Sequence, residues 1–189
     1  AITIIGTQAI YNMMLVDVAA SAFKHFSNQA VDLKRFWRMS IYCGLVTKNL
    51  AIKAGVKDIE RLFVAGLLQN FGELLVAKIT PEVAQRCEKY NRDNLPWDLQ
   101  ELALGFTYTD ISAELLKIWQ LPEKIIIPIR HFNRAQSNQI NKDVKILNLA
   151  SRLALLDSHS DEFDYDEVID QSLCKSLGLS KDDIDKVAE

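Results

Sequence analysis

Glycine, proline and cysteine are scarce in this chain of 189 residues, which contains 7, 4 and 3 of them. Three cysteines that lie far apart argue against a disulfide framework and a zinc knuckle, because both need paired or clustered thiols. We therefore interpret Cys43, Cys87 and Cys174 as reduced thiols of the core. With 49% apolar residues, the composition is that of a globular protein with an ample core.

An excess of positive charge is also lacking, since the net charge is −3. Without a basic excess there is no electrostatic sign of nucleic acid or of an anionic membrane, and we expect neither as a partner. No signal peptide is visible, and charged residues interrupt the apolar runs before the roughly 18–20 residues of a membrane span. We expect a cytoplasmic protein. Because Ala1 begins inside an apolar pattern, we also expect that an upstream segment is missing.

Long stretches with a period of two are absent, so no β-sheet is predicted. The apolar spacing is helical throughout, which predicts an all-α fold of roughly ten short helices. We expect a helical domain over residues 1–157, followed over residues 158–189 by a polar loop, which includes the acidic stretch 161–166, and C-terminal helices. The expected helix caps and stops are Gly6, Thr7, Gly55, Asp58, Thr80, Gly105 and the Ser180/Asp183 pair.

The most apolar predicted helix, "FVAGLLQNFGELLVAKI" (63–79), contains polar residues in its middle. Burial of a polar side chain without a partner costs about 1–3 kcal/mol. Gln69, Asn70 and Glu73 therefore need partners or a function, and Gly66 and Gly72 beside them need an explanation as well.

Four fragments occur in an order that is typical of one family: "FWRMS", "GLLQNFGELL", "GFTYTDISAELLKIWQLPEKI" and "IRHF". Together they resemble the HDOD domain, a branch of the HD-domain phosphohydrolase superfamily whose pattern runs W-R-H-S, G-L-L-H-D-I-G-K, G-F-D-H-A-E-V-G-A-E-L-L, W-x-L-P and a His-His pair. The resemblance spans about residues 2–156. It implies a compact, HD-domain-like multi-helix bundle.

In metal-dependent HD enzymes, a His–Asp pair and outlying His and Asp residues hold divalent metals, which activate a water for phosphoester hydrolysis. This sequence keeps one histidine of the final pair, His131, and departs from the pattern elsewhere. The departing positions are Met39, Gln69, Asn70, Glu73, Tyr108, Phe132 and Ser151. Amide oxygens are weaker ligands than carboxylates, and a thioether is too soft for magnesium or manganese.

The resemblance therefore implies a degenerate pocket formed by these eight residues, with no catalytic residue, metal ligand or cofactor. Gln69 and Asn70 could instead be a structural pair bonded to helix backbone. Glu73 could replace the lost carboxylate, or it could be solvated or paired with an arginine. His131 could be an ordinary surface or core histidine, and the group Arg130, His131 and Arg134 could contact phosphate or be simply solvated.

Other prominent side chains have a structural interpretation. Trp37 and Trp119 are expected to anchor the core, and Tyr108 to bury its ring and to satisfy its hydroxyl.

The function that we predict is a non-catalytic regulatory module of bacterial signal transduction. It would act through a signalling partner or a fused output domain, and a small ligand is an option. The alternative is a metal-dependent phosphohydrolase of the nucleotide or cyclic-nucleotide phosphodiesterase class, with a site rebuilt from Glu73 and His131. A third option is a scaffold for a partner protein.

Overall fold

The computed structural model describes residues 31–137, 140–159 and 161–188, together with Met14, Asp17 and Ser21. The caps predicted at Gly6 and Thr7 lie outside the described residues. Within the described part of the chain the regular structure is helical and contains no strand, which confirms the all-α prediction.

The helices follow one another with short connections. In chain order they are α3 (Leu33–Lys53), α4 (Ile59–Leu68), α5 (Phe71–Ile79), α6 (Pro81–Cys87), α7 (Pro96–Leu104), α8 (Tyr108–Ile118), α9 (Glu123–Arg130), the 3-10 turn η1 (Phe132–Arg134), α10 (Lys142–Ser158), α11 (Tyr165–Val168), α12 (Gln171–Leu177) and α13 (Lys181–Ala188).

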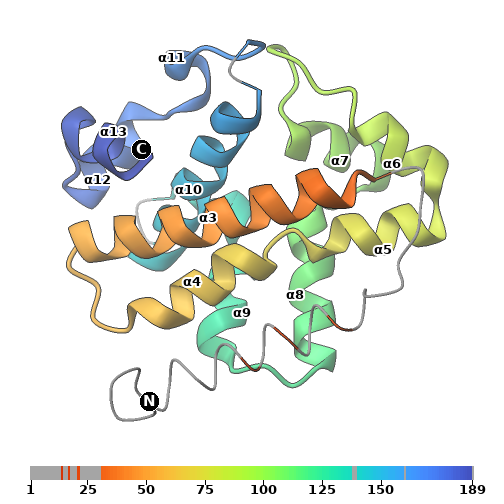
Figure 1. Ribbon diagram of the computed structural model, residues 1–189, viewed down its shortest axis with the longest axis horizontal. Helices are drawn as coiled ribbons and strands as arrows, with labels where there is room; N and C mark the ends of the chain where they lie inside the picture. Colours follow the sequence, from red (N-terminus) through yellow and green to blue (C-terminus); the bar gives the residue numbers. More distant parts are fainter. Residues whose placement is uncertain are drawn as a thin grey trace.

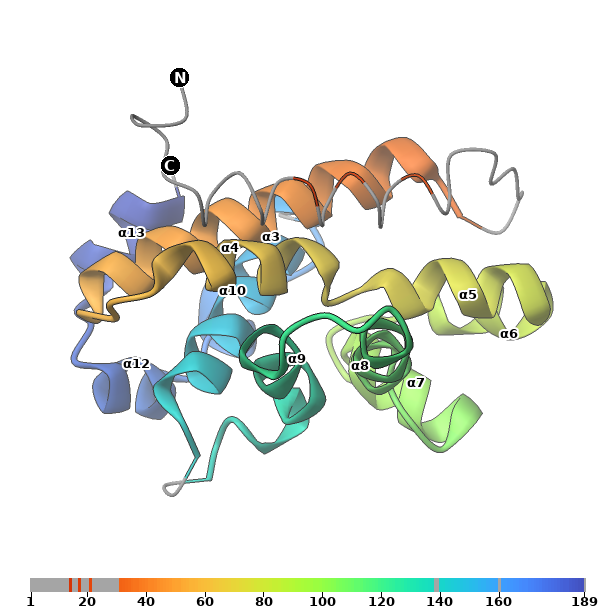
Figure 2. The same cartoon turned by 90° about the horizontal axis from the view of Figure 1, so that it is seen from below.

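The longest helix, α3, crosses the front of the molecule, with α4 beside it and α10 behind (Figure 1). In the perpendicular view, α4 and α5 lie between α3 and the pair α8 and α9 (Figure 2). Helices α5 and α6 are at one end of the molecule, and α12 and α13 are at the other. The core between these helices includes the fully buried side chains of Leu50, Leu68, Phe71, Ile129 and Leu147.

Helices α3 and α4 cross at very close range, which explains a glycine in the apolar run. A Cβ atom on Gly66 would lie 2.6 Å from the Thr47 hydroxyl and 2.9 Å from the Cys43 carbonyl oxygen. Real Cβ atoms do not approach other atoms so closely, so only glycine lets the two helices touch backbone to backbone.

The prediction of one continuous helix over residues 63–79 is wrong, because α4 ends at Leu68 and α5 begins at Phe71. The Gln69–Asn70 turn lies between them. By length and composition the stretch Ile59–Ile79 is long and apolar enough to cross a membrane, contrary to our expectation. Of the most apolar 18 residues of this stretch, 67% are buried inside the domain, as in a helix of a globular core.

Several predicted helix ends are confirmed. Gly55 (φ 72°) and Gly105 (φ 79°) follow helices in the left-handed conformation that glycine adopts without strain. Ser180 and Asp183 form the predicted capping box, in which the Ser180 amide donates to the Asp183 carboxylate at 3.1 Å.

Two predicted caps occupy the expected positions but do not cap with their side chains. The Asp58 carboxylate accepts a hydrogen bond from Lys124 at 2.9 Å, so a tertiary ion pair replaces the local bond. The Thr80 hydroxyl donates backward to the Val76 carbonyl oxygen at 3.3 Å.

The last part of the chain packs on the bundle. The Tyr42 hydroxyl donates to the Ala188 carbonyl oxygen at 2.9 Å, and Lys53 donates to Asp183 at 3.1 Å. The acidic stretch 161–166 is not entirely a polar loop, because Phe163 is 3% exposed and α11 begins two residues later. The sequence did not predict this, because Phe163 is a single apolar residue among charged ones.

The two tryptophans expected in the core are only half-buried, although both pack against it. The rings of Trp37 and Trp119 contact the fully buried ring of Phe71 edge-on, with centroid distances of 5.7 and 6.4 Å.

Candidate functional site

A partly open cavity of about 80 Å³ lies where α3, the Gln69–Asn70 turn, α5, α7, α8 and α10 meet. All seven residues at the departing motif positions line it, although they come from distant parts of the sequence. These are Met39, Gln69, Asn70, Glu73, Tyr108, Phe132 and Ser151. His131 does not line it; this residue follows α9 as its half-buried C-cap.

The contact between α5 and α8 fixes one wall of the cavity. A Cβ atom on Gly72 would lie 2.2 Å from the Tyr108 carbonyl oxygen, so a glycine is required at this position. The Gly72 amide donates to the Ser112 hydroxyl at 2.8 Å, and that hydroxyl donates to the Tyr108 carbonyl oxygen at 2.8 Å. The start of α8, and with it the Tyr108 ring, is thereby held against the first turn of α5.

Glu73 is the buried carboxyl group of the cavity, with 6% exposure. Its Oε2 accepts a hydrogen bond from the Asn70 amide, whereas its Oε1 has no hydrogen-bond partner among the described residues and lies 3.8 Å from Arg35 Nη2. Burial, assisted by the nearby Glu88 charge, raises the pKa of Glu73 to about 8, and Arg35 and Asn70 oppose this shift. The interpretation of Glu73 as solvated is therefore wrong, and its nearest cation is Arg35.

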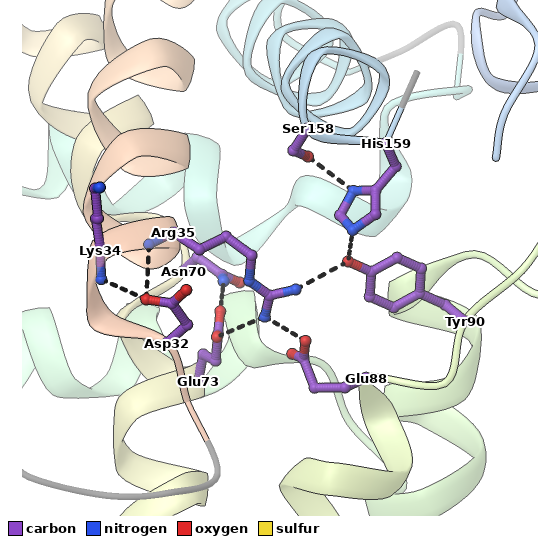
Figure 3. A network of polar contacts seen from close by, with 9 residues as sticks. All are labelled: Asp32, Lys34, Arg35, Asn70, Glu73, Glu88, Tyr90, Ser158 and His159. Atoms are coloured by element: carbon purple, nitrogen blue, oxygen red, sulfur yellow. Dashed lines mark hydrogen bonds and ion pairs between the residues drawn. The ribbon is translucent and has the colours of Figure 1, made fainter. Parts of the chain in front are cut away.

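A polar network connects Glu73 with other residues that line the cavity (Figure 3). The Arg35 guanidinium forms an ion pair with Glu88 and donates to the Tyr90 hydroxyl at 3.5 Å. The Tyr90 hydroxyl in turn contacts His159 Nε2 at 2.9 Å. The sequence did not identify any of these four residues as part of the site. The contacts among them join residues that are 53 to 69 positions apart in the chain, a separation that no local pattern reveals.

Tyr108 is 2% exposed and differs from our expectation in one respect. Its hydroxyl lies beside the Cys87 thiol, and no residue in the described part of the chain gives it an ordinary hydrogen bond. Burial, together with Cys87 and Glu73, raises the pKa of Tyr108. Ser151, by contrast, is satisfied because its hydroxyl donates to the Leu147 carbonyl oxygen at 3.0 Å.

The residues of the cavity do not fit a divalent metal centre. At the positions of the family's metal ligands they offer a thioether, two amides, a phenol and a hydroxyl, and the Glu73 carboxyl is already bonded to Asn70. Among the residues that the structure describes, no group of three or more His, Cys, Asp or Glu side chains could hold a metal ion.

The basic residues near η1 do not form a free phosphate-binding cluster. Arg130 lies 3.6 Å from Glu114 and 3.4 Å from Glu123, so acidic partners already surround it. The remaining members, His131 and Arg134, lie outside the cavity.

Comparison with known proteins shows where this architecture recurs. A crystal structure of an inferred phosphohydrolase from Shewanella amazonensis SB2B superposes with a TM-score of 0.75 and 21% identity, and the match covers 100% of this chain and 70% of that one. A protein of Marinobacter aquaeolei VT8 that is inferred to act in signal transduction gives a TM-score of 0.66 and 23% identity. The match covers 84% of this chain and 35% of that one. At these identities the likeness shows the fold.

In sequence, the chain is 25% identical over 137 residues to an uncharacterized protein of Treponema pallidum (strain Nichols). The match covers 70% of this chain but only 26% of that relative's length. The HDOD domain model matches residues 1–135, which is more than half of the chain. This chain therefore belongs to the HDOD domain family.

Proposed function

We propose that this domain is a non-hydrolytic regulatory module of signal transduction, which works by binding a small ligand or a partner protein at the degenerate HD pocket. Its likeness to a signal transduction protein supports the regulatory part of the proposal. The proposed partner is a signalling protein or an output domain in the cytoplasm.

The observation that carries the proposal is the chemistry of the cavity. Hydrolysis of a phosphoester by an HD centre requires metal-bound water, and activation of that water requires anionic or imidazole ligands. At the corresponding positions this chain has Met39, Gln69, Asn70, Tyr108 and Ser151, and four of these are polar groups suited to hydrogen bonding.

The arrangement of charge supports the same conclusion. Arg35 is paired with Glu88, and Glu73 is buried with a raised pKa, so the cavity lacks a strong net field that would attract a phosphate or a hydrated cation. A pocket with matched charges and free hydrogen-bonding capacity is suited to recognition.

The test combines metal analysis with hydrolysis. We expect the purified chain, equilibrated with manganese, iron or magnesium and then dialysed, to keep less than stoichiometric metal and to leave bis-p-nitrophenyl phosphate and cyclic nucleotides intact. The matched variant restores the family pattern with Met39→His, Gln69→His, Asn70→Asp and Tyr108→His, and should bind more metal than the natural sequence. Stoichiometric metal with turnover that Gln69→Ala abolishes would disprove the proposal.

The alternative, a phosphohydrolase with a rebuilt site, needs Glu73 and His131 at the same metal. Only Glu73 lines the cavity, so no contact in the described residues favours this alternative. The same assay decides between the two functions.

A further inference from the structure

Two buried polar atoms of the cavity lack hydrogen-bond partners within the part of the chain that the structure describes. They are Oε1 of Glu73, whose nearest charged contact is Arg35 Nη2 at 3.8 Å, and the hydroxyl of Tyr108, which lies beside the Cys87 thiol; the two residues are 6% and 2% exposed. Both residues line the cavity, and the Glu73 charge acts on the Tyr108 hydroxyl. Buried polar groups without a hydrogen bond are rare in folded proteins because each costs free energy, so two of them in one cavity give it unused capacity to bind a polar ligand.

Each of the two groups can either donate or accept a hydrogen bond. A phenol has one donor and two acceptor positions, and a carboxyl group donates when protonated and accepts when ionised. Since the pKa of Glu73 is about 8, both of its forms are populated near neutral pH. A ligand that presents one donor beside one acceptor can pair with both groups in either state.

We propose that the cavity binds a small neutral ligand through a cis-amide edge, in which an N–H and a C=O on one side of a ring pair with the Glu73 carboxyl and the Tyr108 hydroxyl. The ionised carboxyl accepts from the N–H while the phenol donates to the carbonyl. The protonated carboxyl donates to the carbonyl while the phenol accepts from the N–H. The proposal rests on the proposed binding function and names its ligand class.

The charges around the cavity favour a neutral ligand over an ion. Arg35 and Glu88 neutralise each other, and a phosphate would approach two carboxyl groups, those of Glu73 and Glu88. A cationic ligand would in turn meet the Arg35 guanidinium near Glu73. A neutral amide encounters neither repulsion.

The size and the walls of the cavity favour a compact ring. A cavity for one buried water has a volume of roughly 10–15 Å³. The cavity of about 80 Å³ can therefore hold a few heavy atoms of a ligand, and the rest of a larger molecule would lie at its open side. Trp97, Tyr90 and Phe132 contribute aromatic surface to the lining, against which a flat ring can pack.

The experiment measures binding of 2-pyridone to the chain by calorimetric titration and by amide NMR shifts. The matched probe is N-methyl-2-pyridone, which keeps the ring and the carbonyl but has no N–H. Hydantoin provides a second ring amide, and inorganic phosphate and tetramethylammonium provide the anion and the cation. We expect saturable binding of the two N–H probes, with shifts at residues around Glu73, and none for the other three.

Two variants distinguish the proposed contact from general packing. Tyr108→Phe removes only the hydroxyl and should weaken binding of 2-pyridone about tenfold without lowering the melting temperature. The control is Tyr165→Phe, since the Tyr165 hydroxyl is also buried without a hydrogen bond to any described residue but Tyr165 does not line this cavity. It should leave binding unchanged.

Four results would overturn the proposal: no saturable binding of either ring amide, equal binding of the two pyridones, tighter binding of phosphate or tetramethylammonium, or full affinity in a folded Tyr108→Phe variant. These results are independent of the hydrolysis assay. A chain that neither hydrolyses phosphoesters nor binds ring amides would retain the proposed non-hydrolytic role and lose only the ligand class.

Discussion

The buried carboxyl group of Glu73 makes a specific prediction about pH and stability. Its pKa is raised from 4.5 to about 8, chiefly by burial. For a group whose pKa is raised by folding, the stabilisation is fully present below the unfolded pKa and is lost as the pH rises through the folded pKa. Arg35, Glu88, Asn70, Tyr90 and Tyr108 all interact with Glu73. The perturbation that isolates Glu73 is Glu73→Gln, which is neutral at every pH.

The magnitude follows from proton linkage. Between about pH 4.5 and pH 8 the unfolded chain has an ionised Glu73 while the folded chain keeps it largely protonated, so folding takes up one proton. The free energy of unfolding of the natural chain should fall, relative to Glu73→Gln, by about 1.4 kcal/mol per pH unit in this window. The accumulated difference is on the order of a few kcal/mol, and above pH 8 it should stay constant.

The assay is urea unfolding of both proteins at several pH values from 5 to about 9 in constant salt, followed by circular dichroism. Glu82→Gln, which removes an exposed carboxyl in α6, is the matched control for the loss of a glutamate charge at the surface. A pH-independent difference for Glu73→Gln, or one that favours the natural chain more as the pH rises, would refute the assignment of a raised pKa.

Three further substitutions test the packing, each by urea unfolding. Gly72→Ala should destabilise the fold by about 1–3 kcal/mol, because its Cβ would meet the Tyr108 carbonyl oxygen, and an unchanged midpoint would contradict this close approach. Asp143→Asn should cost about 3 kcal/mol, because the largely buried Arg61 loses the carboxylate 2.8 Å away and keeps only that of Asp58 at 3.6 Å; a loss below about 1 kcal/mol would mean that the pair is effectively solvated. Thr107→Ala should cost about 1–2 kcal/mol because Thr107 caps α8, and no loss would argue against the cap.

The sequence predicted the fold well where local chemistry decides structure. Gly55 and Gly105 end helices because the chain adopts a positive φ there, and this preference belongs to the residue itself. The ordered fragments of the family likewise predicted which distant residues would meet, and Met39, Asn70 and Tyr108 line one cavity accordingly.

The sequence could not predict features that depend on tertiary partners. The apolar run through Gln69 and Asn70 has the pattern of one helix, yet the chain turns there so that α5 can pack against the start of α8. The environment of Glu73 depends on Arg35 and Glu88, which lie on other parts of the chain. Asp58 shows the same limit, because an ion pair with a distant lysine replaced its predicted cap.

The contact of Gly72 with α8 has a consequence for how such a domain can diversify. Main-chain atoms and the Ser112 hydroxyl hold the start of α8, which brings Tyr108 to the cavity, so its position does not depend on the other side chains that line the space. Residues such as Met39 or Gln69 can therefore be exchanged over evolutionary time without collapse of the surrounding architecture. A scaffold of this kind can lose an inherited chemistry and acquire a new one while its frame remains in place.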